Sequence, residues 1–232
     1  MKTSLSINCS ICSSRGHSVF CDLSEDKLQI LKDHKDTRIY KKHEFIFEQG
    51  LIPKGLFCIF SGLVKIFKLS PGGKEQIVRL AQTGDILGYR SFFSGQSYAA
   101  SAQAVQETTI CFIEKEGVEK LIFHSPELVY KFLRKLCVEL GEAEQKFQDF
   151  LEKSAEERLS CFLELMMKNS NSKEMTLLLT REEIASLIGA RPETVIRIFS
   201  QWRRKKLIKL KTKSIAILKP SYIFREGRLA QR

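Results

Sequence analysis

The sequence lacks long apolar runs, and this excludes a class of protein. Nowhere in its 232 residues is there a stretch close to the roughly 20 consecutive apolar residues that a membrane span needs. The first residues, MKTSLSIN, contain no apolar run of the kind found in a secretory signal. We therefore expect a cytoplasmic protein that does not enter a membrane.

Histidine is also scarce, and no catalytic set is visible. The four histidines, His17, His34, His43 and His124, are scattered and none is paired with a nucleophile. We therefore expect no enzyme activity.

Acidic residues are rare in the last part of the chain, which is strongly basic. The whole chain has a net charge of +11. From position 197 onward there are twelve lysines and arginines and a single acid, Glu226. A basic block inside a patterned domain is typical of proteins that bind a phosphate backbone, although a solvated basic surface would show the same charge.

Residues 37–113 contain many short apolar runs separated by turn residues. Examples are Glu44–Phe47, Gly55–Phe60 and Leu63–Lys68, with glycines at positions 50, 62, 72 and 73 between or after them. Short strands at regular spacing predict an all-β sandwich or roll. We divide the chain into a cysteine-bearing leader (1–22), a β-roll domain (23–124), a long helical segment (125–153) and a basic C-terminal domain (154–232).

The segment from about Pro126 to Lys153 has apolar residues at alternating spacings of four and three. This is the heptad pattern of a coiled coil, and a helix packed on its own domain is the alternative. The predicted dimer seam is Val129, Leu133, Leu136, Leu140, Ala143, Phe147 and Phe150.

A helix-turn-helix followed by a β-wing is predicted near the C-terminus. Thr180 and Glu183 have the spacing of a capping box at the start of a helix that ends at Gly189. A second helix begins at Pro192 and runs to Trp202. Two short apolar runs, 207–210 and 214–218, would form the wing.

The first residues of the second helix would meet DNA bases in the major groove. Arginine can pair with guanine, glutamate can accept from cytosine, and an aliphatic side chain can touch a thymine methyl group. The predicted base contacts are Arg191, Glu193, Ile196 and Arg197. The predicted phosphate contacts are Thr180, Thr194, Arg203, Arg204, Lys205 and Lys206. A surface ion pair between Glu193 and Arg197 is the bland alternative.

The segment Thr180–Leu218, with the order β-roll, long helix and a Gly84–Gly88 turn upstream, resembles the CRP/FNR family of transcription regulators. The resemblance implies an α+β protein with an N-terminal cyclic-nucleotide-binding-like jelly roll and a C-terminal winged helix-turn-helix. It also implies a homodimer that binds palindromic double-stranded DNA and meets RNA polymerase. The family's reading of a shared G·C pair carries over to Glu193 and Arg197, whereas Ile196 matches neither subfamily.

The same resemblance argues against cAMP as the effector. The nucleotide-binding members carry a glutamate and an Arg-Ser pair where this chain has Tyr89 and Tyr98–Ala99. A cyclic phosphate without an arginine partner would be held poorly.

Seven cysteines are present, and three lie in the leader as Cys9-x2-Cys12-x8-Cys21. Clustered cysteines in a reducing cytosol indicate metal or redox chemistry. The leader resembles that of the oxygen-sensing FNR branch, with a longer last gap. That resemblance implies a [4Fe-4S] cluster on Cys9, Cys12, Cys21 and Cys111, and four thiolates are what such a cluster needs.

Other interpretations of the leader remain open. Cys9, Cys12 and Cys21 with His17 could bind structural zinc, the thiols could form a redox switch, or the leader could hold no metal. If the leader cysteines bind structural zinc or nothing, a small-molecule effector in the β-roll would control the protein. Cys58, Cys137 and Cys161 stand in apolar patterns, and we expect them in the core.

The leading hypothesis is therefore an oxygen- or redox-controlled transcription regulator. An intact cluster would tie the leader to the β-roll and allow the seam helices of two chains to pair. Oxidation would release the tie and lower operator affinity.

Overall fold

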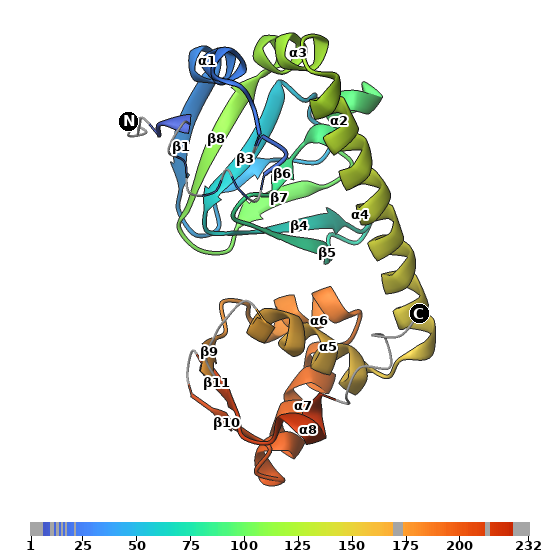
Figure 1. Cartoon of the computed structure of the whole chain (residues 1–232). Coiled ribbons are helices and arrows are strands. Elements are labelled where there is room, and N and C mark those ends of the chain that lie inside the picture. Colours follow the sequence, from blue (N-terminus) through green and yellow to red (C-terminus); the bar gives the residue numbers. More distant parts are fainter. Residues whose placement is uncertain are drawn as a thin grey trace. The chain divides into compact units, whose positions relative to one another are not determined.

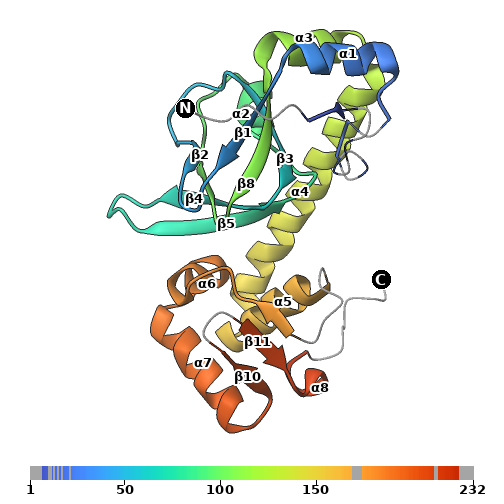
Figure 2. The same cartoon turned by 90° about the vertical axis from the view of Figure 1, so that its left-hand side faces the viewer.

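The computed structural model describes residues 7–9, 12, 14, 16, 18–20, 22–168, 174–211 and 214–224. The chain divides into two compact units, residues 1–141 (unit 1) and 142–232 (unit 2), and the boundary falls within one long helix. Figures 1 and 2 show the elements of both units in two views. None of the helices in the described ranges is long and apolar enough to cross a membrane.

Unit 1 is built on two antiparallel four-stranded sheets. One sheet has the order β1-β8-β3-β6 and the other β2-β7-β4-β5, and both are visible in Figure 1. The strands are β1 (Lys35–Tyr40), β2 (Phe45–Phe47), β3 (Gly55–Ser61), β4 (Leu63–Leu69), β5 (Glu75–Gln82), β6 (Ile86–Leu87), β7 (Ser101–Ala104) and β8 (Thr108–Glu114). The predicted β-roll is confirmed.

The inner faces of the sheets form one apolar core, because strand residues alternate between two faces. Phe57, Ile59, Ile110 and Phe112 belong to this core, together with Tyr98. Their sequence neighbours Leu56 and Ile113 belong to a second core outside the first sheet.

Helices cover that second core. They are α1 (Glu25–Asp33), α2 (Tyr89–Ser94), α3 (Lys115–Phe123) and the first half of α4 (Pro126–Glu152). In both views α1 and α3 lie side by side (Figures 1 and 2). Leu128 and Phe132 anchor α4 in this core, where Phe132 meets the ring of Phe20 edge-on at 6.3 Å between centroids.

Unit 2 contains the predicted helix-turn-helix and wing. Its elements are α5 (Ala155–Lys168), β9 (Glu174–Thr176), α6 (Arg181–Ile188), α7 (Pro192–Arg204), β10 (Ile208–Leu210), β11 (Ser214–Ile217) and α8 (Pro220–Ile223). The wing has a third strand, β9, which pairs with β11 and was not predicted. The α+β fold class is confirmed.

Candidate functional site

Local chemistry fixes the turn between α6 and α7. The Thr180 hydroxyl oxygen accepts a hydrogen bond from Glu183 N–H at 3.2 Å, and the Glu183 carboxylate accepts one from Thr180 N–H at 2.9 Å. The predicted capping box is therefore confirmed. Gly189 ends α6 with a φ of 62°, where a Cβ atom would lie 2.8 Å from the Phe150 ring. Pro192 begins α7.

One face of α7 is packed and the other is open. The packed face consists of Val195, Ile198, Phe199 and Trp202. Phe199 lies under the Arg181 guanidinium, whose carbon is 4.2 Å from the ring centroid. The Trp202 indole N–H donates to Glu156 Oε1 at 2.6 Å and so attaches α7 to α5.

The predicted base-reading residues lie on the open face. Arg191, Glu193 and Arg197 are exposed, and Ile196 is 50% exposed. Within the part of the chain that the structure describes, no ion pair joins Glu193 to Arg197, so both charges are available to a ligand.

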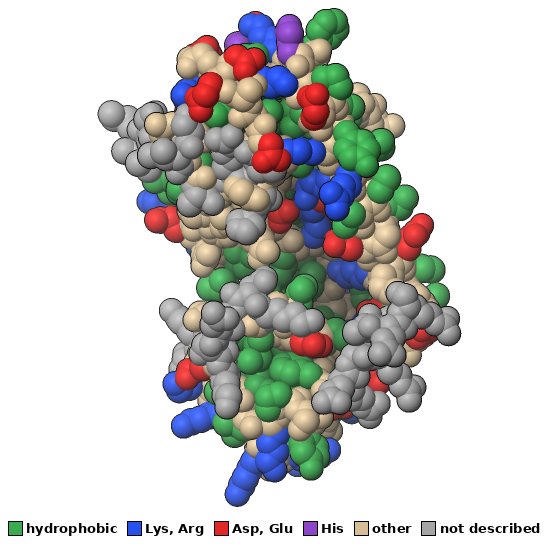
Figure 3. Space-filling model, viewed as in Figure 1, with side chains coloured by type: hydrophobic (Ala, Val, Ile, Leu, Met, Phe, Trp, Pro, Cys, Tyr) green, Lys and Arg blue, Asp and Glu red, His purple; other side chains and the backbone are tan. Residues whose placement is uncertain are grey.

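The predicted phosphate-binding residues border this face. Arg203, Arg204, Lys205 and Lys206 are exposed at the end of α7, and Thr194 is half-buried. Figure 3 shows lysine and arginine side chains gathered at the lower end of unit 2, where α7 ends in Figure 1. The arrangement offers a basic surface beside a recognition helix, as proteins that bind the DNA backbone require.

The predicted dimer seam follows one side of α4. Its members Val129, Leu133, Leu140 and Phe147 are 44–65% exposed, so their own chain leaves them largely uncovered. Two other members have partners within the chain. Leu136 packs partly against the second core of unit 1, and the Arg158 guanidinium carbon lies 5.3 Å from the centroid of the Phe150 ring. Ala143 is exposed.

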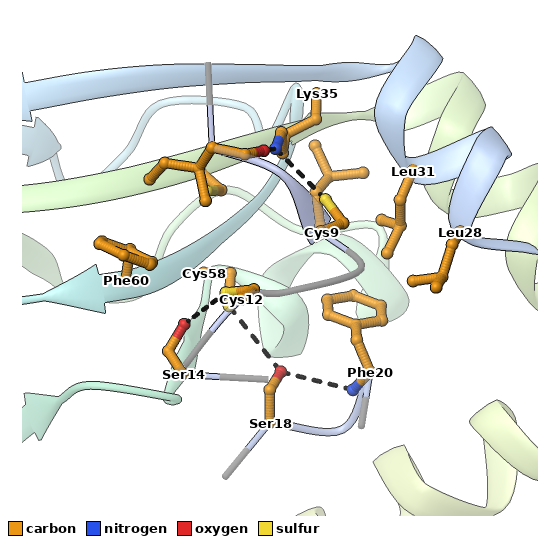
Figure 4. A pocket seen from close by; sticks show the side chains of 13 residues that line it. Cys9, Cys12, Ser14, Ser18, Phe20, Leu28, Leu31, Lys35, Cys58 and Phe60 are labelled. Atoms are coloured by element: carbon orange, nitrogen blue, oxygen red, sulfur yellow. Dashed lines mark hydrogen bonds between the residues drawn. The ribbon is translucent and has the colours of Figure 1, made fainter. Parts of the chain in front are cut away.

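Three of the four predicted cluster ligands line one pocket in unit 1. Cys9 and Cys12 come from the leader (Figure 4), and Cys111 comes from β8. The fourth, Cys21, lies outside the described residues, as does His17 of the zinc alternative. Among the residues described, no three His, Cys, Asp or Glu side chains are close enough together to hold a metal ion.

A cation and two hydroxyls line the same region. Lys35 Nζ donates to Cys9 Sγ at 3.2 Å and to the carbonyl oxygen of Ile7, which attaches the leader to β1. The hydroxyl of Thr37 lies 3.8 Å from Cys111 Sγ, and that of Ser14 lies 3.0 Å from Cys12 Sγ. Burial raises the pKa of Cys111, although the positive charge of Lys35 opposes this effect.

A fourth thiol, Cys58, also lines this pocket, and the sequence did not predict it. We expected Cys58, Cys137 and Cys161 in the core. The expectation is wrong for Cys137 and Cys161, which are exposed on α4 and α5, because each stands on the outer side of its helix. Cys58 is half-buried on the wall of the thiol pocket, and burial raises the pKa of its thiol to about 12. Cys58 lies at the pocket because the register of β3 and β8 sets it directly opposite Cys111.

Models of known protein families match segments of both units. A family model described as "Cyclic nucleotide-binding domain" covers residues 37–125, and one described as "Crp-like helix-turn-helix domain" covers residues 157–223. The transcriptional activator protein Anr of Pseudomonas protegens is 30% identical over 80% of this chain and 78% of that protein. The chain belongs to the CRP/FNR family. It is a DNA-binding transcription regulator rather than an enzyme, and family membership implies that it dimerises.

Other CRP/FNR relatives also match most of this chain. The transcriptional activator protein FnrA of Stutzerimonas stutzeri is 28% identical over 91% of this chain and 88% of its own length. The structure of FixK2 from Bradyrhizobium japonicum superimposes with a TM-score of 0.75 over 85% of this chain and 99% of that chain, at 23% identity. That likeness supports the fold.

Tyr89 and Tyr98, two of the residues that the resemblance sets against the nucleotide-binding positions of the family, are both buried. Tyr89 is 1% exposed, and its hydroxyl donates to the Glu139 carboxylate on α4. Tyr98 is 5% exposed and stacks on Phe47 with 4.0 Å between ring centroids. Burial raises the pKa of Tyr98 to about 12, so the phenol stays neutral.

Glu139 is the centre of a charged cluster that attaches α4 to the β-roll. Its carboxylate pairs with Arg79 of β5 and, at 3.1 Å, with Lys135, which also reaches Asp85 at 3.2 Å. Burial raises the pKa of Glu139, but the charges of Arg79 and Lys135 and the Tyr89 hydroxyl outweigh it, so the pKa lies below its usual range.

Proposed function

We propose that this regulator senses oxygen or another oxidant through a [4Fe-4S] cluster held by Cys9, Cys12, Cys21 and Cys111. The observation that carries the proposal is the meeting of Cys9 and Cys12 from the leader with Cys111 from β8 in one pocket. Thiols are the donors that such a cluster uses, and its oxidation state and stability respond to oxidants.

Residues of this chain position the leader thiols and set the charge and polarity of the pocket. Lys35 holds the leader to β1 through Cys9 and the Ile7 carbonyl, which brings the first thiols to the β-roll before any ligand is bound. Its ammonium group also offsets the negative charge that several thiolates in an apolar pocket would create. The walls are apolar, with Phe20, Leu28 and Leu31 among them, and these side chains limit access of water to the thiols.

The pocket is linked to the dimerisation helix through one aromatic contact. Phe20 lines the pocket and packs edge-on against Phe132 of α4. Phe132 in turn contacts Phe93 of α2 at 5.0 Å between centroids. Release of the leader thiols would free Phe20, loosen the anchoring of α4 and weaken the pairing of the seam. A coupling of about 1 to 3 kcal/mol is enough for a useful switch.

At the DNA, Glu193 and Arg197 read bases, with Arg191 and Ile196 beside them. Thr180, Thr194, Arg203, Arg204, Lys205 and Lys206 hold phosphates. Two recognition helices in a dimer would occupy successive major grooves about 34 to 36 Å apart on a palindromic operator. Recruitment of RNA polymerase completes the proposal. Because this chain has Tyr89 and Tyr98–Ala99 where the nucleotide-binding members carry a glutamate and an Arg-Ser pair, the proposal does not include cAMP as effector.

The test of the sensor is analysis of protein purified without oxygen. We expect a brown protein with about four irons per chain that bleaches in air and loses operator affinity. Cys9→Ser should abolish the colour, whereas Cys137→Ser, at an exposed thiol outside the pocket, should retain it. A colourless protein with one zinc, or with no metal after reconstitution, would contradict the cluster.

The test of DNA reading is a mobility-shift titration on an operator selected from random palindromes. Arg197→Ala should weaken binding by about 1 to 3 kcal/mol and relax the sequence preference at one base pair. Lys205→Ala should weaken binding to all sequences and reduce the salt dependence by about one charge. If Arg197→Ala left the base preference unchanged, the assigned reading face of α7 would be wrong.

A further inference from the structure

Cys58 and Cys111 are direct partners across two neighbouring antiparallel strands. The register of β3 and β8 pairs Cys58 with Cys111, Leu56 with Ile113 and Gly55 with Glu114. In an antiparallel pair every second pair of residues exchanges backbone hydrogen bonds. The position of Cys58 and Cys111 in that alternation therefore sets the distance between their Cα atoms.

The alternation can be counted from the end of the strands. Lys115 N–H donates to the Lys54 carbonyl at 3.0 Å, and this pair stands two positions before Leu56–Ile113 and four before Cys58–Cys111. Cys58 and Cys111 therefore form a hydrogen-bonded pair, for which the Cα atoms are about 5.5 Å apart. Disulfides span Cα separations of about 4.4 to 6.8 Å, so this pair lies within their range.

Both side chains also point to the same side of the sheet. The flanking residues Phe57, Ile59, Ile110 and Phe112 pack into the core between the two sheets. Because strand side chains alternate, the two cysteines face the opposite side, toward the thiol pocket with Cys9 and Cys12.

We propose that Cys58 and Cys111 form a reversible disulfide in the metal-free protein. The reaction breaks two S–H bonds and forms one S–S bond. Two electrons and two protons pass to the oxidant, so that one molecule of hydrogen peroxide becomes two molecules of water. The disulfide removes Cys111 from the ligands of the proposed cluster, and this consequence, unlike the disulfide itself, rests on the proposed function.

The surroundings of the two thiols set the conditions for the reaction. Cys111 is buried and Cys58 half-buried, so an oxidant in water reaches them less readily than the exposed Cys137 and Cys161. The crosslink should therefore form more slowly than oxidation of those two exposed thiols.

The experiment is a peptide map of full-length, metal-free protein after treatment with hydrogen peroxide and blocking of free thiols. Trypsin cuts after lysine and arginine, which places Cys58 alone in peptide 55–65 and Cys111 alone in peptide 91–115. We expect these two peptides to be linked after oxidation, lighter than their sum by two hydrogens, and separated by dithiothreitol.

Cys58→Ser should abolish the linked pair, and Cys137→Ser is the matched control that should keep it. If Cys58→Ser does not fold, Cys58→Ala serves the same purpose with a smaller apolar side chain. Recovery of both peptides in blocked, unlinked form would overturn the proposal, as would a link from peptide 91–115 to a leader peptide instead.

Iron and sulfide reconstitution separates this proposal from the proposed function. Oxidised wild-type protein should take up a cluster only after thiol reduction, whereas oxidised Cys58→Ser should need reduction far less. If the protein takes up a cluster but the linked peptides never form, the disulfide is refuted alone. If the peptides link but no treatment yields a cluster, the proposed function is refuted and the disulfide stands.

Discussion

The Glu139 cluster gives the sharpest prediction about stability. Glu139→Ala would remove a side chain that is 15% exposed and would leave Arg79, Lys135 and the Tyr89 hydroxyl without their shared acceptor. Hydrogen bonds to charged groups contribute about 1.5 to 3 kcal/mol, and breaking a fully buried ion pair costs about 3 to 5 kcal/mol.

The expected loss lies at the lower end of that range. The side chains of Arg79 and Lys135 are 29% and 22% exposed, so water can replace part of what the carboxylate provided, and Lys135 keeps Asp85. We therefore expect Glu139→Ala to lower the free energy of unfolding of unit 1 by about 2 kcal/mol. Scanning calorimetry with circular dichroism would measure it.

The pH dependence identifies the cause. The pKa of Glu139 lies below its usual range in the folded chain, so its charge stabilises the fold above the ordinary pKa near 4.5. This stabilisation is lost as the pH falls through the folded-state value. Glu139→Gln keeps an acceptor for Tyr89 but has no charge. The free energy of unfolding of Glu139→Gln should therefore be lower than that of the wild type at pH 7, and this difference should shrink in acid.

Glu107→Ala removes an exposed carboxylate from unit 1 and should change the free energy of unfolding by no more than about 0.5 kcal/mol. If Glu139→Ala were as mild as Glu107→Ala, or if the deficit of Glu139→Gln persisted unchanged in acid, the reasoning from charge and hydrogen bonding would be refuted.

Three further predictions concern other parts of the chain. Thr180→Ala should destabilise unit 2 by about 1 kcal/mol through loss of the capping box, and Thr180→Ser should retain most of that stability in the same thermal melts. The pKa values of Tyr89 and Tyr98 are raised in the folded chain, so their contribution to stability is complete below the ordinary tyrosine pKa and is lost as the pH rises above it. Circular dichroism should therefore show unfolding from about pH 10 upward, and Tyr89→Phe should unfold at a higher pH than the wild type. Leu133→Glu should shift sedimentation toward the monomer, whereas Val138→Glu, at an exposed apolar residue off the seam, should not.

Local sequence patterns predicted the elements that depend on residues close to one another in the chain. The capping box at Thr180, the start of α7 at Pro192 and the extent of α4 each depend on residues within a few turns of one another. The pairing of Cys58 with Cys111 depends on the register of strands 53 residues apart in the chain, which periodicity does not determine.

The same limit applies to Tyr89 and Glu139. Their hydrogen bond joins residues 50 positions apart, and only the packing of α4 on the β-roll brings them together. Cys137 and Cys161 were expected in the core but are exposed. Apolar neighbours in the sequence do not show which side of a helix is covered.

The position of Trp202 has a practical consequence. It is the sole tryptophan of the chain, it belongs to unit 2, and it lies on the packed face of α7 with its indole N–H bonded to Glu156. Fluorescence excited at wavelengths that tyrosine does not absorb will therefore report on the surroundings of the recognition helix alone. The chain thus contains an intrinsic optical probe that can follow the helix-turn-helix during denaturation or operator binding while remaining blind to the melting of the β-roll.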